Sequence, residues 1–365
     1  MPQARIGRGQ NMTQLYSNLK FLRFRPQLDA LAQGGLAAPV HIRIKPINRC
    51  NHNCWYCAYR VDNLALGEAM NTEDVLPLDM MHGIVDDVIG MGVRAVTFSG
   101  GGEPLLYKGL PEVVRRLALG GVKVATLTNG SNLKGAMADA FAAHGAWVRV
   151  SLDAWDDESY ARARGVAADS FTRLLSNLRA FAARKSDCVL GVSFIVSETN
   201  APHLAKVCAL LKDAGVNHVK VSGAVVSNDR EENNAYHRRL HGVVAEQVAA
   251  AKRLDDDGFR IVDHYHELED RFEKSYTRCA FLQFLTVIGA DGAVYTCQDK
   301  AYTASGYLGS LRGRTFKEFW YSDENRKRLA EINPELQCRH HCVAHQKNLV
   351  LHEYTNVDNR HVEFV

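Results

Sequence analysis

The sequence predicts an α/β protein whose parallel strands form a curved, open (β/α)6 sheet, followed by a small α+β module. Short apolar runs rich in β-branched residues alternate along the chain with amphipathic stretches of helical period. Strands separated by helices form right-handed βαβ units and therefore a parallel sheet. The six predicted strands are fewer than the eight of a closed barrel. We therefore favour an open, curved sheet over a flat, doubly wound one.

The predicted strands and helices alternate in order. The strands are bounded by turn residues and cover 41–45, 95–99, 122–128, 147–152, 189–196 and 218–222. The helices between them cover 78–90, 110–119, 133–144, 169–184 and 202–214, and several end at a glycine: Gly92, Gly120, Gly145 and Gly215. Ligands of parallel α/β proteins bind at the carboxyl ends of the strands, so we expect function in the loops that follow each strand.

Four segments are expected along the chain. They are an N-terminal helical lead-in (1–37) with Leu15, Leu19, Leu22 and Phe24 on one face, the barrel core (38–230), a helical linker (231–278) and a second module (279–365). In that module, residues 281–288 and 293–296 flank Asp291-Gly292, which predicts a β-hairpin, and a helix is predicted at 315–330.

Composition and charge exclude several classes of protein. The 365 residues are 46% hydrophobic and 23% charged, as in ordinary globular proteins. The 44 basic and 41 acidic residues give a net charge of +3, which indicates neither a nucleic-acid nor a membrane partner. The first residues lack the apolar core of a secretory signal, so a cytoplasmic location is expected. There the nine cysteines indicate metal or redox sites rather than disulfides.

Three cysteines, Cys50, Cys54 and Cys57, follow the first predicted strand with the spacing C-x3-C-x2-C. Three thiolates so close in sequence can bind one metal centre, and both iron–sulfur clusters and zinc accept thiolate. A cluster with three protein ligands leaves one iron open to a reactive ligand. The alternatives are a structural zinc loop, with His52 or another group as fourth ligand, and three unconnected buried cysteines.

A glycine-rich turn, Ser99-Gly100-Gly101-Gly102-Glu103-Pro104, follows the second predicted strand. It is neither a phosphate-binding loop nor a dinucleotide fingerprint, because no Gly-Lys-Ser/Thr follows and position 105 is leucine. Glycines permit close backbone approach, and the Glu103 carboxylate suits an ammonium group. The alternative is an ordinary strand-to-helix turn.

Together these motifs resemble the radical S-adenosylmethionine (radical SAM) superfamily over residues 40–225. The resemblance implies that Cys50, Cys54 and Cys57 hold a [4Fe–4S] cluster that binds S-adenosylmethionine (AdoMet). It further implies AdoMet contacts from Tyr56, Gly101, Gly102, Glu103, Ser151 and Arg164, with Arg162 as a rival of Arg164. The alternatives are a satisfied strand-end hydroxyl for Ser151 and a solvated helix charge for Arg164.

Four more cysteines, Cys279, Cys297, Cys338 and Cys342, have the spacing C-x17-C-x40-C-x3-C. They resemble the SPASM/twitch extensions of radical SAM enzymes, which hold auxiliary iron–sulfur clusters. The chain lacks the further cysteines of a full SPASM domain, which implies the shorter form with one auxiliary [4Fe–4S] cluster and no open iron. The alternative is a zinc-ribbon-like site of four cysteines, or of three completed by His340, His341 or His345.

The resemblance implies that AdoMet is cleaved reductively to a 5′-deoxyadenosyl radical, which abstracts hydrogen from the substrate. Electron acceptance by an auxiliary cluster would then give oxidation and require a base, for which Gln298, Asp299 and Lys300 are candidates. Hydrogen return from a thiol such as Cys338 or Cys342 would give epimerisation instead, and that thiol would not be a cluster ligand.

The substrate is expected to be a small polar molecule such as a sugar, aminosugar or sugar nucleotide. Polar residues share one face of the first strand and of the sixth, namely His41, Arg43, Lys45, His218, Lys220 and Ser222. An electron donor such as flavodoxin or ferredoxin is expected, and no membrane or nucleic-acid partner. The alternatives are a SPASM-type peptide or protein side-chain maturase, disfavoured by a lead-in of only 37 residues, and a non-catalytic zinc-binding protein.

Overall fold

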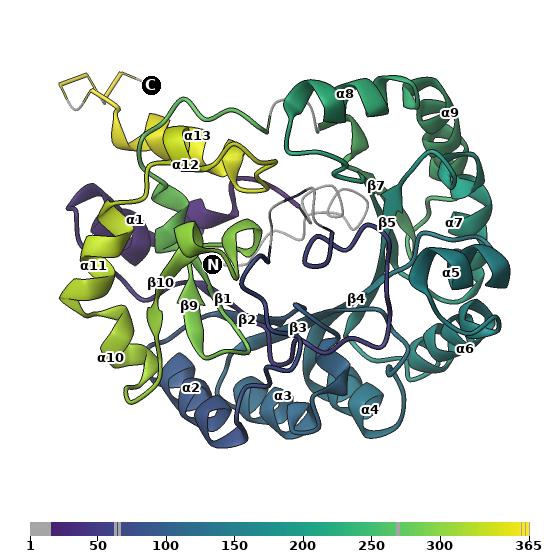
Figure 1. The fold of residues 1–365 in the computed structure, drawn as a ribbon, viewed down its shortest axis with the longest axis horizontal. Helices are drawn as coiled ribbons and strands as arrows, with labels where there is room; N and C mark the ends of the chain where they lie inside the picture. The colour runs from purple at the N-terminus through teal and green to yellow at the C-terminus, as the bar shows by residue number, and fades with distance from the viewer. Residues whose placement is uncertain are drawn as a thin grey trace, which may run out of the picture.

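The structure, a computed structural model, describes residues 16–61, 64, 67–267, 271–358, 360–361 and 363–364. Its strands form one sheet in the order β10-β9-β8-β1-β2-β3-β4-β5-β6-β7. The sheet is curved, and helices α2 to α7 cover its outer side (Figure 1). The predicted α/β class and the mainly parallel, curved sheet are therefore confirmed.

The six predicted strands all occur, within two residues at each end, and each pairs in parallel with the next. They are β1 (His41–Ile44), β2 (Ala95–Phe98), β3 (Lys123–Thr128), β4 (Gly145–Ser151), β5 (Val189–Val196) and β6 (His218–Gly223). The predicted helices are α2 (Leu78–Gly90), α3 (Leu110–Leu119), α4 (Gly135–His144), α6 (Ser170–Ala182) and α7 (Leu204–Asp213). An additional helix, α5 (Asp157–Arg164), begins at a capping box formed by Asp156 and Ser159.

The segment expected to be a helical linker also contains a strand. Helices α8 (Arg230–Arg238) and α9 (His241–Lys252) are followed by β7 (Arg260–Asp263), which pairs in parallel with β6. The sheet therefore continues past the six predicted strands. The four residues of β7 have charged ends, so they are too short and too polar to produce the alternation that marks a strand.

The predicted hairpin joins the same sheet. It consists of β8 (Leu285–Ile288) and β9 (Ala293–Tyr295), which are antiparallel, and β8 pairs in parallel with β1. Strand β10 (Tyr307–Ser310), which was not predicted, pairs with β9. The helix predicted at 315–330 is two helices, α10 (Phe316–Trp320) and α11 (Asp323–Ala330), because Ser322 caps the second. Helices α12 (Pro334–Gln337) and α13 (His345–Thr355) complete the module.

The N-terminal segment packs on this module, and of the predicted residues Phe24 takes part in the contact whereas Leu19 and Leu22 do not. Leu19 and Leu22 are 53% and 42% exposed, and Leu15 lies outside the described residues. Instead Phe21, in the 3-10 turn η2 (Lys20–Arg23), and the leucines of α1 (Arg25–Ala32) pack with Phe284 and with Leu351 of α13. Among the described residues, no helix combines the length and apolar character needed to span a bilayer.

Candidate active site at the carboxyl ends of the strands

The loop after β1 carries the first three cysteines, which are half-buried free thiols. A backbone hydrogen bond of 3.1 Å from Cys57 to Cys54 closes a tight turn between them. The sulfur of Cys50 accepts the His52 N–H at 3.4 Å and faces Asn129 Nδ2 at 4.0 Å. Burial raises the pKa of Cys50 to about 11, so a bound metal is needed to keep this group as thiolate near neutral pH.

Arg164 lies against this loop and has partners that the sequence did not predict. Its Nη2 and Nε donate to Asp153 Oδ1 at 2.5 and 3.2 Å, and its Nη1 donates to the sulfur of Cys54 at 3.5 Å. Burial alone would lower the pKa of Arg164, but Asp153 holds it well above its ordinary value. The rival Arg162 is 67% exposed. Arg164 is therefore a buried cation beside Cys54, and its contact with AdoMet stays a prediction.

The glycines of the glycine-rich turn pack against the approach to the first cysteine. A Cβ atom on Gly102 would overlap the carbonyl group of Arg49, and one on Gly101 would overlap the Asn48 side chain. Side chains are excluded at these two positions because the glycine-rich turn contacts Asn48 and Arg49. The sequence instead suggested that the glycines allow the backbone to approach a ligand closely. Contact of these glycines with AdoMet stays a prediction.

Glu103 is 2% exposed and connects this turn to the end of β3. Its carboxylate accepts the backbone N–H groups of Leu105 at 3.0 Å and Asn129 at 2.7 Å, and also the Thr128 hydroxyl. Burial raises its pKa, and these donors oppose that rise. Glu103 thus fixes Asn129, whose amide faces Cys50, and its contact with the AdoMet ammonium stays a prediction.

Several buried polar atoms at the strand ends lack a hydrogen-bond partner among the described residues. They include the Tyr56 hydroxyl and the Ser99 hydroxyl, while Ser151 ends β4 half-buried and opposite Ser193. Buried polar groups are normally satisfied, so these atoms fit a bound polar molecule. Together with three free thiols in one loop, they fit a cluster that carries AdoMet.

The second group of cysteines gathers from separate points of the module. Cys279 precedes the 3-10 turn η7 (Ala280–Gln283), Cys297 follows β9, and Cys338 and Cys342 follow α12. Burial raises the pKa of Cys297, followed by Asp299 and then by the other three thiols, so Asp299 and these thiols all lie near Cys297. The amide of Asn348 donates to the sulfur of Cys279 at 3.5 Å. The sequence analysis did not identify Asn348, because nothing in the cysteine spacing points to this residue.

The surroundings of this second group include a buried positive charge. Within the described ranges, no three His, Cys, Asp or Glu side chains are arranged to hold a single metal ion. The buried Lys274 ammonium, held by the carbonyl groups of Arg271, Phe272 and His340, supplies positive charge beside the thiols. His345 Nδ1 instead lies 3.2 Å from the Tyr276 hydroxyl.

A hydrogen-bonded link connects the loops of the two cysteine groups. Lys45 is fully buried, and its Nζ donates to the Tyr59 hydroxyl at 2.7 Å and to a carbonyl oxygen of the glycine-rich turn at 2.5 Å. The Tyr59 hydroxyl donates to the carbonyl oxygen of Gln298 at 3.1 Å. Tyr59 stands two residues after Cys57, and Gln298 directly follows Cys297. The two cysteine groups therefore meet at the same end of the sheet.

Among the candidate bases, Asp299 has the surroundings of a functional carboxylate. Burial raises the pKa of Asp299, while Arg43, Lys274 and Lys45 oppose the rise. Lys300 donates instead to the exposed side chain of Ser305 at 3.0 Å. The position of Asp299 among three cations keeps it as the candidate base.

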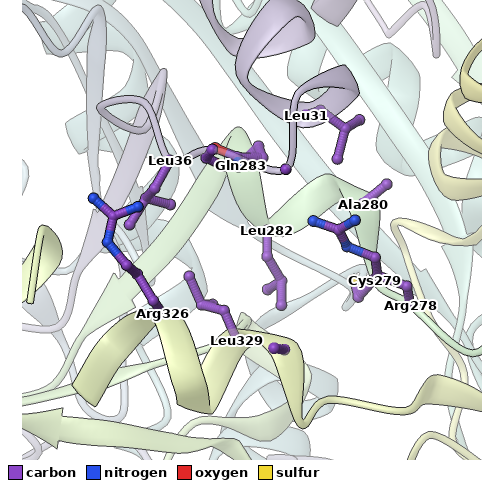
Figure 2. Close-up of a pocket in the computed structure, with 12 residues that line it drawn as sticks. Leu31, Leu36, Arg278, Cys279, Ala280, Leu282, Gln283, Arg326 and Leu329 are labelled. Carbon is purple, nitrogen blue, oxygen red and sulfur yellow. Dashed lines mark hydrogen bonds between the residues drawn. The ribbon is translucent and has the colours of Figure 1, made fainter. Parts of the chain in front are cut away.

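Two hollows adjoin the cysteine loops. Figure 2 shows the first, of about 130 Å³, between α1, η7 and α11; its lining includes Leu31, Leu36, Cys279, Leu282 and Leu329. Ligand pockets usually measure about 300–1,000 Å³, so this hollow is too small for a metabolite. The second, of about 490 Å³, is polar and lies beside the first cysteine loop; its lining includes Asn51, His52, Lys134 and Asn177.

Comparison with known families accounts for both cysteine groups. A model of the radical SAM superfamily matches residues 44–197, and a model of the SPASM iron–sulfur cluster-binding domain matches residues 279–343. The chain is a radical SAM protein with a SPASM-type domain. These domains imply a [4Fe–4S] cluster with AdoMet in the first domain and an auxiliary cluster in the second, as the sequence predicted.

Relatives of this radical SAM protein have diverse activities. The AdoMet-dependent heme synthase of Methanosarcina barkeri is 24% identical over 77% of this chain and 82% of its own length. GTP 3′,8-cyclase 2 of Pseudomonas aeruginosa is 32% identical, but the match spans 33% of this chain and 35% of the cyclase. Relatives of this kind do not fix the substrate.

Solved structures show the same fold at low identity. Streptococcus suis SuiB bound to its precursor peptide SuiA has a TM-score of 0.62 and 16% identity, covering 90% of this chain and 77% of SuiB. The AdoMet-bound anSMEcpe with the Kp18Cys peptide has a TM-score of 0.60 and 16% identity, covering 87% and 99%. Such likeness supports the fold alone.

Proposed function

We propose that this radical SAM enzyme dehydrogenates a small polar substrate that binds inside the curved sheet, between the two cysteine groups. In this proposal Cys50, Cys54 and Cys57 hold the AdoMet-binding cluster, and the auxiliary cluster is held by Cys279, Cys297, Cys338 and Cys342. The observation that carries the proposal is the hydrogen-bonded link through Lys45 and Tyr59. A second redox site whose loop is hydrogen-bonded to the loop of the first favours oxidation over epimerisation.

When bound, the cluster and AdoMet supply the 5′-deoxyadenosyl radical that takes a hydrogen atom from the substrate. Dehydrogenation also removes an electron, which the auxiliary cluster would accept, and a proton, which the chain's own residues handle. The Asp299 carboxylate accepts it, because burial raises its pKa and so strengthens it as a base, while Arg43 and Lys45 favour its ionised form. Lys45 and Tyr59 keep the two loops in register while this occurs.

The electron that AdoMet cleavage requires enters the protein through the loop of Cys50, Cys54 and Cys57. Trp55 is 50% exposed next to Cys54, so this loop reaches the protein surface. We assign the surface around Trp55 to an electron donor of the flavodoxin or ferredoxin type.

A second candidate is the modification of a peptide side chain. It is favoured by solved structures of similar fold with bound peptides, SuiB with SuiA and anSMEcpe with Kp18Cys. Dehydrogenation of a small molecule ranks first because unpartnered polar groups gather inside the sheet. A peptide substrate would instead be expected to bind through backbone pairing or apolar pockets.

The test is anaerobic turnover of the reconstituted, reduced protein with AdoMet and a panel of sugars, aminosugars and sugar nucleotides. The proposal predicts substrate-dependent 5′-deoxyadenosine and one equivalent of a product two electrons more oxidised. The D299N variant should form 5′-deoxyadenosine but lose most of the oxidised product. A product isomeric with the substrate would contradict the proposal in favour of epimerisation, and turnover only with peptides would favour the second candidate.

A further inference from the structure

Two arginines face the inside of the curved sheet. Ile42 and Ile44 of β1 are fully buried in the core beneath the outer helices, so the alternating Arg43 faces the opposite side. The same alternation applies to β4, where Val148 and Val150 belong to that core. Arg149 therefore also faces the inside, and strands β2 and β3 separate it from β1.

Among the described residues, neither arginine forms a hydrogen bond or an ion pair with a carboxylate. In the described part of the chain, the Arg43 guanidinium makes no hydrogen bond or ion pair, and its Nε is buried without a partner. Arg149 donates to the Tyr16 hydroxyl at 3.1 Å, and its Nε is likewise buried and unpartnered. Surface arginines differ: Arg314, for example, pairs with Glu324 at 2.7 Å. Buried guanidinium nitrogens are normally hydrogen-bonded, so the free Nε atoms of these two arginines indicate an anionic ligand, even with the Asp299 carboxylate near Arg43.

Polar groups lie next to Arg43 and Arg149, and the two guanidinium charges repel each other. The Tyr16 hydroxyl also lies 2.9 Å from His218 Nε2, and the buried His218 Nδ1 has no hydrogen-bond partner among the residues that the structure describes. Arg149 lowers the pKa of Arg43, next after burial, so the two cations repel each other. Asp299 opposes this effect from the side of the second cysteine group. A bound anion would remove the repulsion.

We propose that Arg43 and Arg149 bind a phosphate group of the substrate inside the curved sheet. Two guanidinium groups carry two positive charges, which match the roughly −1.5 to −2 of a phosphate monoester and exceed the single charge of a carboxylate. Guanidinium groups also bind phosphate oxygens in bidentate fashion. Arg43 lies two residues before Lys45, which is about 6.6 Å along the strand. The phosphate therefore binds below the cysteine loops and leaves the attached sugar or nucleoside beside them. This inference rests on the proposed function and names its substrate class.

The test measures binding of inorganic phosphate to the reconstituted protein by calorimetry, with acetate at equal ionic strength as the comparison. Phosphate should bind, acetate should bind at least tenfold more weakly, and R43Q and R149Q should each lose at least tenfold in phosphate affinity. The matched control R314Q should keep the parent affinity. Because the Arg43 guanidinium forms no ion pair within the described part of the chain and is repelled by Arg149, R43Q should also unfold at or above the temperature of the parent protein when phosphate is absent.

Undiminished phosphate affinity in both R43Q and R149Q, or equal affinity for acetate, would overturn the inference. The two proposals fail separately. Absence of phosphate binding with AdoMet-dependent dehydrogenation intact refutes the phosphate site alone. Absence of AdoMet cleavage with phosphate binding intact refutes the proposed function alone.

Discussion

Replacing Arg164 with methionine tests the buried charge next to the first cysteine loop. The Arg164 and Asp153 side chains are each 3% exposed, so R164M leaves a carboxylate buried without its partner. Breaking such a pair costs about 3–5 kcal/mol. Unfolding entropy of about 2.1 cal/mol/K per residue amounts to ~0.77 kcal/mol/K over the 365 residues, so Tm should fall by about 4–6 °C.

The assay is thermal unfolding of the protein followed by circular dichroism under anaerobic conditions. R162M is the matched control, because Arg162 lies on the same helix and is 67% exposed; its Tm should change by less than about 1 °C. The double variant R164M/D153N should be less destabilised than the sum of the two single variants, because no unpaired charge remains. The assignment of a buried ion pair would be refuted if R164M unfolded at the same temperature as R162M. It would also be refuted if the stability losses of R164M and D153N simply added in the double variant.

Further predictions concern the glycine-rich turn, the buried histidines and the second cysteine group. G102A should lower Tm and iron content, because its Cβ atom has no space, whereas G83A, with nothing near its Cβ position in helix α2, should raise Tm slightly; equal behaviour of the two would contradict the loop contact. Burial lowers the pKa values of His41 and His218 to about 3 and about 4, while the unfolded chain titrates near 6.5. Stability should therefore be complete above about pH 6.5 and fall towards pH 4, as measured by urea midpoints, and H218N should flatten the loss; a midpoint independent of pH would exclude this. Replacing Asn348 with leucine removes a hydrogen bond to a cluster sulfur and should make the reduction potential of the auxiliary cluster more negative in an EPR-monitored titration, and an unchanged potential would argue against that bond.

The sequence predicted the elements whose signal is local. The six strands from β1 to β6 and the hairpin at Asp291-Gly292 follow from short apolar runs and turn residues, which depend on neighbours in the chain. Strands β7 and β10 were missed because their sequences, Arg-Ile-Val-Asp and Tyr-Leu-Gly-Ser, contain no apolar run, and their pairing with β6 and β9 holds them in place. The lead-in was misread because Phe21, rather than Leu19, meets the distant Phe284.

For the candidate site too, the sequence predicted what spacing patterns show and not the contacts that only folding creates. The cysteine spacings are local patterns and predicted both domains. The partners of Arg164 and Glu103 could not be predicted, because Asp153 and Asn129 reach them only through the folded strand ends. The Tyr59 contact with Gln298 spans 239 residues and leaves no trace in the spacing.

The central claim is that two separate cysteine groups hold two iron–sulfur clusters at one end of the sheet. The most direct measurement is the iron content and Mössbauer spectrum of the anaerobically reconstituted protein, compared with variants that lack either group. The account predicts about eight irons as two [4Fe–4S] clusters, and about four in the triple variant C50A/C54A/C57A. The triple variant should also lose all formation of 5′-deoxyadenosine. A colourless zinc-containing protein, or a triple variant that still cleaves AdoMet, would contradict the account.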